Sequence, residues 1–199
     1  MFAGDRVQFH HPLRVGESIS RLSRILDVNL KQGRSGPLVF VVVRHEISDR
    51  GGVAVAEEHD IVYRESPKPH DAAPQPQKPP SGAAWTREIR TDDVLLFRYS
   101  ALTFNSHRIH YDRRYAIQVE GYPGLVVHGP LIATLLLDLL RRNLGDATVT
   151  SLSFRAMRPL FDIAPFRVCG KVASDGKTVQ LWAADSEGWL AMEATAGLA

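Results

Sequence analysis

The segment 130–144, "PLIATLLLDLLRRNL", limits the possible folds more than any other part of this sequence. Its large aliphatic residues recur at helical spacing in two neighbouring rows: Leu131, Leu135 and Leu139 beside Ile132, Leu136 and Leu140. Pro130 suits the first turn of a helix, Arg141 and Arg142 suit the last, and Gly145 suits its end. A helix that is apolar around most of its girth has to be covered by other structure, so the pattern predicts a buried central helix.

After this helix the apolar period changes from about 3.6 residues to about 2. Alternation in "TSLSFRAM", "FRVCGKV" and "TVQLWAADSEGWLAMEATAGL" predicts antiparallel strands. The first part of the chain offers strands only, in "RVQFHHPL", "ESISRLSRILDVNLK", "LVFVVVRHEIS" and "VAVAEEHDIVYRE". Between the two parts, residues 66–82 hold six of the twelve prolines and predict an extended linker. We therefore predict an N-terminal unit at 1–65 and a C-terminal unit at 83–199.

A weak similarity between the two parts, in the same order along the chain, suggests that one unit is duplicated. "HPLRVGESI" resembles "RPLFDIAPF", and "FVVVRHEISDRGGVAVAEEHD" runs parallel to "TVQLWAADSEGWLAMEATA". Only the second copy has a central helix, because nothing upstream of Arg6 could form one. We expect the first copy to be truncated at its start or to borrow a helix from elsewhere.

Composition and charge argue against several classes of protein. The formal net charge is +2 and no run of Lys and Arg exceeds two residues, which argues against a nucleic-acid binder. Cys169 is the one cysteine, so no internal disulfide can form, which fits a reducing compartment. The longest apolar segment, 131–140, is far shorter than the roughly 20 residues of a membrane span, and no signal peptide is recognisable. We expect a cytoplasmic protein without metal or dinucleotide, because no ligand spacing or Gly-rich loop suggests either one.

The stretch "FNSHRIHYDRRYA", residues 104–116, gathers an amide, two histidines and an acid just before the predicted helix. Taken alone, Asn105 fits a turn or a cap, and His107 fits a structural histidine that only makes hydrogen bonds. The stretch is therefore either a turn or a site.

The whole pattern, one long helix wrapped by an antiparallel sheet and duplicated in one chain, resembles the double hot-dog fold of the MaoC-like hydratases and dehydratases. That family's motif reads as an acid, a variable residue, Asn-Pro, an aliphatic residue and His, with a small residue six positions later. "NSHRIH" occupies this frame, with Ala116 in the place of the small residue. "RYSALTFNSHRIHYD" and "VEGYPGLVVHGPL" look still closer to the type 2 hydroxyacyl-thioester dehydratases and the mesaconyl- or itaconyl-CoA hydratases. These carry Asn where the wider family has its catalytic Asp.

The resemblance implies an α+β double hot-dog with a central helix in the C-terminal unit and none in the N-terminal unit. It also implies a hydro-lyase that hydrates an enoyl-CoA thioester or dehydrates a 3-hydroxyacyl thioester, as in fatty acid metabolism. His110 matches the catalytic histidine and Asn105 the position of the aspartate.

The chemistry of these residue types agrees with such roles. A neutral histidine, with an ordinary pKa of about 6.5, can act as the base, which suits His110. Asn105 can orient water through its amide but cannot take its proton. Pro130 has no N–H, so the Gly129 N–H at the helix start is the predicted oxyanion donor. His128, His107 and Arg113 are further candidates for substrate binding, and Arg113 would suit the phosphates of CoA.

Two alternatives stay open, because one fold can host several chemistries. The chain could be an acyl-CoA thioesterase, or a non-catalytic subunit that binds acyl thioesters. We also expect either a homodimer or a longer natural chain, since an N-terminal sheet without a helix leaves apolar side chains uncovered. These side chains are Val39, Val41, Val43, Val53 and Val55.

Overall fold

The structure of the chain, a computed structural model, describes residues 2–33, 36–64 and 75–199. These residues fold into two compact units, each built on antiparallel strands. The described residues of the first unit lie within 2–64, at 75, and within 148–155 and 195–199, and those of the second lie within 76–147 and 156–194. Residues 66–74 of the predicted linker lie outside the described residues, and the predicted boundaries at 65 and 83 stay a prediction.

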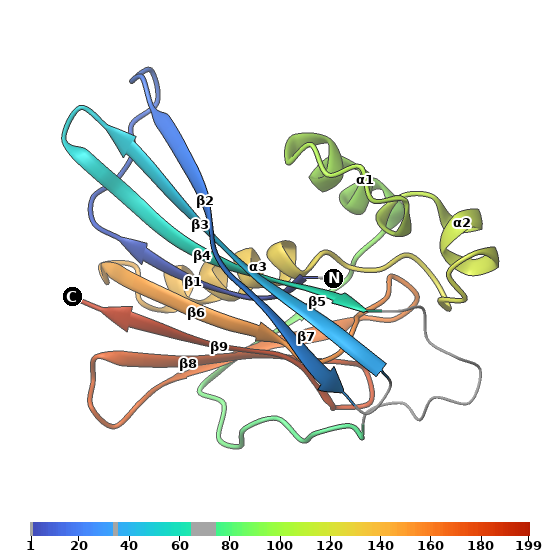
Figure 1. Cartoon of the computed structure of the whole chain (residues 1–199). Coiled ribbons are helices and arrows are strands. Elements are labelled where there is room, and N and C mark those ends of the chain that lie inside the picture. The colour runs from blue at the N-terminus through green and yellow to red at the C-terminus, as the bar shows by residue number, and fades with distance from the viewer. Residues whose placement is uncertain (1, 34–35, 65–74) are drawn as a thin grey trace. The chain divides into compact units, whose positions relative to one another are not determined.

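Five antiparallel strands build the first unit in the order β2-β3-β4-β1-β6 (Figure 1). Their bounds are β1 Phe2–Phe9, β2 Ser20–Gly33, β3 Gly36–Asp49, β4 Gly52–Arg64 and β6 Val149–Ala156. Runs of valine in β3 favour extended backbone, because β-branched side chains pack well on a pleated surface. On one face, Arg6 pairs with Glu58 and Asp60, so that side is polar. Within the described residues this unit contains no helix, as the sequence predicts.

The edge strand β2 is exposed along its described length, although it carries several apolar side chains. About half or more of each of these side chains is open to solvent: Leu22, Ile25, Leu26, Val28 and Leu30. Val53 on β4 is exposed as well. Of the five valines on which the homodimer prediction rests, only Val53 is exposed, whereas Val39, Val41, Val43 and Val55 are half-buried. The exposed apolar side chains of this sheet lie mainly on β2, and the homodimer itself stays a prediction.

The second unit carries all the described helices. Its strands follow one another in the order β9-β8-β7-β5, and the last residues of β9, 195–198, are counted with the first unit. The strand bounds are β5 Trp85–Ile89, β7 Phe166–Val172, β8 Thr178–Ala184 and β9 Leu190–Leu198. The helices are α1 Asp93–Leu102, a 3₁₀ turn η1 at Arg108–His110, α2 Arg113–Gln118 and α3 Gly129–Asn143. Figure 1 shows α1 and α2 together, beside the N-terminal end of α3.

Helix α3 is the buried helix that the sequence predicts. Pro130 lies in its first turn, and Arg141 and Arg142 lie in its last. It contacts β5, β7 and β8, and most of its apolar side chains are buried: Leu131, Ile132, Ala133, Leu136, Leu139 and Leu140. The hydrophobic burial of this helix holds the second unit together.

The sequence-based description of this unit as one helix followed by strands was incomplete, because it omitted β5, α1 and α2. Helix α1 has no clear apolar stripe, and Leu96 and Ser100 are its only buried side chains. Its start was nevertheless marked, because Asp92 caps the helix by accepting a hydrogen bond from the Leu95 N–H.

Cys169 on β7 is buried beside Trp182 and Leu190, with Met157 packed against them. Its sulfur accepts a hydrogen bond from the Thr86 hydroxyl on β5, at 3.7 Å.

None of the helices in the described ranges is long and apolar enough to cross a membrane, and the cytoplasmic location stays a prediction.

Truncating Leu136 to alanine tests the central position of α3. Leu136 is 0% exposed, so Leu136→Ala should lower the free energy of unfolding by about 2–5 kcal/mol. Leu102, at 81% exposed, is the matched control, and Leu102→Ala should change it by less than about 0.5 kcal/mol. Urea unfolding followed by tryptophan fluorescence measures both, and equal effects at the two positions would contradict the burial of α3.

Candidate active site

The end of α1 fixes the position of Asn105. The Asn105 N–H donates to the Ser100 carbonyl at 2.9 Å, and the Phe104 N–H donates to the Ala101 carbonyl at 3.3 Å. This pair of bonds is a Schellman motif, which needs a left-handed residue between the helix and Asn105. Phe104 takes that role with φ 53°, where glycine is usual. Asn105 is thus held by backbone bonds next to a strained residue.

A tight turn then leads from Asn105 to His110. The Asn105 Oδ1 accepts a hydrogen bond from the His107 N–H at 3.0 Å, and the Tyr111 hydroxyl donates to the Ser106 carbonyl at 2.9 Å. Asn105 is therefore a turn residue, as its type alone suggests. Its Oδ1 retains a second lone pair, and its Nδ2 has no hydrogen-bond partner among the described residues, so the amide can still contact a ligand.

His110 is only 7% exposed and is tied to the segment that leads into α3. Its Nδ1 lies 2.7 Å from the Val126 carbonyl oxygen, and the Val126 N–H donates to the Ile109 carbonyl at 3.0 Å. A carbonyl can only accept, so the proton resides on Nδ1 and the lone pair of Nε2 is free. Burial lowers the pKa of His110 against the opposing hydrogen bond to Val126. The ring is thus a neutral base at neutral pH.

His128 and Gly129 form the start of α3 beside this ring. The fully buried His128 ring stacks on His110 with 3.8 Å between centroids and 16° between planes. Gly129 follows directly, and Pro130 cannot donate a hydrogen bond. The unpaired N–H groups and partial positive charge of a helix start therefore lie next to the histidine pair.

Two adjoining hollows open beside Asn105. The larger, of about 410 Å³, is lined by Tyr99, Thr103, Phe104, Asn105, Ser106, His107 and Pro130. The smaller, of about 310 Å³, shares three of these residues and adds Phe97, Ser100, Ala101 and Tyr111. The structure thus brings Asn105, His107 and the start of α3 to one cleft. His110 and His128 line neither hollow.

Arg113 already has a partner in the structure. Its guanidinium forms an ion pair of 2.5 Å with Asp162, a residue that also accepts a hydrogen bond from the Leu125 N–H. The pair ties α2 to the chain before and after α3. The binding of CoA phosphates by Arg113 stays a prediction.

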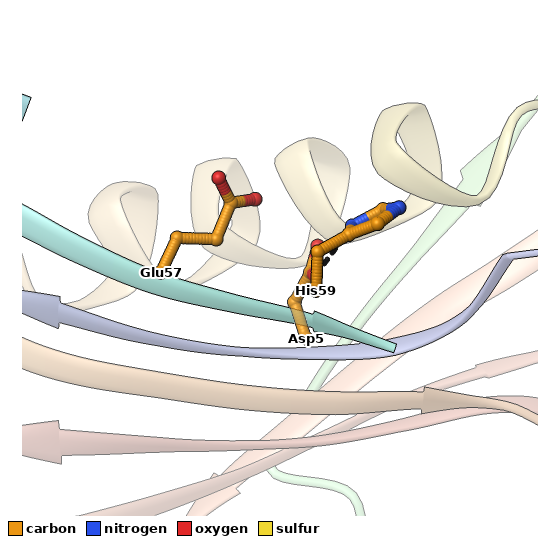
Figure 2. Close-up of side chains that lie close together, drawn as sticks. All are labelled: Asp5, Glu57 and His59. Atoms are coloured by element: carbon orange, nitrogen blue, oxygen red, sulfur yellow. Dashed lines mark hydrogen bonds and ion pairs between the residues drawn. The ribbon is translucent and has the colours of Figure 1, made fainter. Parts of the chain in front are cut away.

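One group of described residues, in the first unit, has side chains that could hold a metal ion. Figure 2 shows Glu57 and His59 on β4 and Asp5 on β1, whose nearest ligand atoms lie within 4.8 Å of one another. The His59 ring nitrogen Nδ1 bonds to the buried Asp5 carboxylate at 2.7 Å. This bond raises the pKa of His59, so the imidazolium itself balances one carboxylate. The expectation of no metal stays a prediction.

Comparison with solved structures places this fold. A MaoC-like dehydratase from Phytophthora capsici matches all of this chain and 71% of its own, with a TM-score of 0.78 and 15% identity. HtdX from Mycobacterium tuberculosis matches 99% of this chain and 76% of its own, with a TM-score of 0.75 and 22% identity. The chain therefore has the hot-dog fold of the MaoC-like dehydratases, as predicted.

The sequence comparisons narrow this class. Residues 1–162 match the sequence family "Hydroxyacyl-thioester dehydratase type 2". The chain is also 48% identical over 198 residues to a mesaconyl-C(4)-CoA hydratase from Chloroflexus aurantiacus, a match that covers the whole of this chain and 70% of that relative. The chain belongs to the type 2 hydroxyacyl-thioester dehydratase family. The predictions of this family and of a hydro-lyase are confirmed.

The strain at Phe104 can be separated from the contribution of its ring. Phe104→Gly should raise the free energy of unfolding by about 1 kcal/mol, because glycine adopts a positive φ without steric cost. Phe104→Ala removes the same 95% exposed ring but keeps the Cβ, so it should give no such gain. Urea unfolding measures both variants. A stability gain of the same size in both would show that the backbone at Phe104 is not strained.

The Asp5–His59 pair should make folding depend on pH. Because the pKa of His59 is raised, the protonated ring stabilises the folded state fully below its ordinary pKa of about 6.5. This stabilisation is lost as the pH rises through the raised pKa. Burial raises the pKa of Asp5, which acts in the same direction. Between about pH 6 and about pH 9, the free energy of unfolding should fall more for the native chain than for Asp5→Asn.

Asp146→Asn, at an exposed position, is the control for this comparison and should keep the native pH dependence. Urea titrations at the two pH values give the free energy of unfolding of all three proteins. If this free energy falls by the same amount in the native chain and in Asp5→Asn, the pairing of Asp5 with His59 is contradicted.

Proposed function

We propose that the chain catalyses the reversible hydration of an enoyl-CoA thioester, with His110 as acid and base, Asn105 orienting water and the Gly129 N–H binding the thioester oxygen. The observation that supports this most is the hydrogen bond from His110 Nδ1 to the Val126 carbonyl. It leaves a free lone pair on Nε2 of a neutral, buried imidazole beside the start of α3.

The reaction follows from these groups. Water adds its oxygen to the β-carbon of the enoyl thioester and gives a proton to His110 Nε2. The electron pair of the double bond moves to the thioester oxygen, where the Gly129 N–H and the helix start stabilise the enolate. The enolate then takes the proton from Nε2 at its α-carbon, which restores the neutral histidine. No metal or redox cofactor enters this sequence.

The nature of the acyl group is proposed from the relatives. Because the chain is 48% identical to a protein named for mesaconyl-C(4)-CoA, we propose mesaconyl-CoA as the first substrate to test. His107 lines the larger hollow and is exposed, so we assign it to substrate binding rather than to proton transfer. The uncovered apolar side chains of β2 support a homodimer as the working form.

One assay separates this function from its alternatives. The purified chain is mixed with crotonyl-CoA, mesaconyl-CoA and itaconyl-CoA, while enoyl absorbance and free thiol are followed in parallel. Loss of enoyl absorbance without thiol supports the hydratase. Release of thiol identifies an acyl-CoA thioesterase, and binding without either change identifies a non-catalytic acyl-thioester subunit.

Substitutions test the roles within the site. His110→Ala should lower kcat by about 10²–10⁴-fold with the fold intact, because the only base is removed. Asn105→Ala should lower kcat strongly, and Asn105→Asp should retain part of it if the amide only orients water. Complete loss in Asn105→Asp with substrate still bound would show that donation by the NH2 group is needed.

His10→Ala is the matched control, because His10 is an exposed histidine of the first unit. Steady-state kinetics on the three thioesters should show native kcat for this variant. Native activity in His110→Ala would overturn the assignment of the base and direct attention to His107.

A further inference from the structure

The ring of His128 stacks on the ring of His110, and the proposed reaction gives His128 no role. The rings are nearly parallel, with 16° between their planes and 3.8 Å between their centroids. His128 lies at the N-cap position of α3, yet its side chain makes no capping hydrogen bond. The residues that usually cap a helix start are Ser, Thr, Asp and Asn, and the ring of His128 contacts His110 instead.

Ser100 in the last turn of α1 sets the orientation of His128. Its hydroxyl lies 2.8 Å from His128 Nε2, and both side chains are buried. The Ser100 carbonyl also accepts the hydrogen bond that positions Asn105. The rings of Tyr99 and His128 meet in a T-shaped contact, with 4.9 Å between their centroids. One turn of α1 therefore positions both Asn105 and the ring that supports His110.

The second nitrogen of His128 shows that this ring stays neutral. Its Nδ1 is buried without a hydrogen-bond partner within the described part of the chain. An imidazolium would bury a charged donor there without an acceptor, which costs far more than a bare lone pair. Burial, with smaller effects of His110 and His107, lowers the pKa of His128 to about 3. Only His110 of the stacked pair can therefore take up a proton at neutral pH.

Building on the proposed function, we infer that His128, oriented by Ser100, is a positioning residue: it fixes the plane of the His110 ring so that Nε2 is held ready to take a proton from water. The hydrogen bond to Val126 fixes one nitrogen of His110 but leaves the ring free to turn about that contact. The stack removes this freedom, because rotation would break the contact between the two faces. Neither Ser100 nor His128 needs to touch the substrate for this role.

The titratable groups that face the pair are few among the described residues. His107 precedes η1, and its ring centroid lies 6.4 Å from that of His110. Tyr99 faces His128 from α1, and the first turn of α3 carries no acidic residue. A change in the protonation of His110 can therefore be assigned to burial and to its histidine neighbours.

Two substitutions separate the hydrogen bond from the stack. Ser100→Ala removes the bond to Nε2 and keeps the ring, and His128→Gln keeps an amide that can reach Ser100 but removes the ring. Ser100→Ala should lower kcat by about tenfold and leave KM within about twofold, because positioning acts on the transition state. His128→Gln should lower kcat at least as much. It should also move the acid limb of the kcat/KM profile up toward about pH 6.5, since water then reaches His110.

Ser186→Ala, an exposed serine in a turn, is the control for a serine substitution and should keep native kcat, KM and pH profile. Unfolding midpoints of all variants separate a loss of fold from a loss of positioning. Native kcat and an unchanged acid limb in both Ser100→Ala and His128→Gln would overturn the inference. A fall in kcat that is fully accounted for by unfolded protein would overturn it as well.

A second readout does not depend on turnover. Nitrogen NMR of the histidine rings should show His110 with its proton on Nδ1 and His128 without titration between about pH 5 and about pH 8. In His128→Gln, the titration of His110 should move up toward its ordinary value. If the native chain hydrates none of the thioesters, the proposed function is wrong. If the titration of His110 is the same in His128→Gln as in the native chain, the positioning inference is wrong.

Discussion

The arrangement of the second unit depends on the burial of α3. The helix is apolar on most of its surface, so strands β5, β7 and β8 have to cover it. Its first N–H groups cannot be satisfied within the helix, and they accumulate at the one end where the chain arrives from the polar turn. The core and the proposed site therefore depend on the same helix, because the strands cover its length and its N-terminal end offers the unpaired N–H groups.

The chemistry that we propose for that end depends on keeping a basic group uncharged. Two buried histidines lie face to face, and two of their four ring nitrogens have a hydrogen-bond partner among the described residues: His110 Nδ1 with the Val126 carbonyl and His128 Nε2 with the Ser100 hydroxyl. Burial disfavours the imidazolium in both rings, and His128 Nδ1 is itself buried without a described partner, so His110 Nε2 is the nitrogen that we propose as the base. The second unit thus combines a desolvated base with the partial positive charge of a helix start.

The sequence predicted the features that have a period or a motif. The two aliphatic rows of α3 and the alternation in β7 to β9 could be read directly, and the frame around His110 identified the family. Helix α1 was missed because it has no clear apolar stripe and α2 because it is only six residues long, although Asp92 and Asp112 cap their starts. Ser100 gave no signal, because its partner lies 28 residues further along the chain. The left-handed backbone at Phe104 was equally hidden, since glycine is the usual sign of that conformation.

The single thiol has a practical consequence. Cys169 lies between β5 and β8 and is closed off from solvent by Trp182 and Leu190. A thiol in such surroundings is inert toward alkylating reagents until the strands around it separate. The rate at which the native chain reacts with such a reagent therefore reports the opening of the second unit's core.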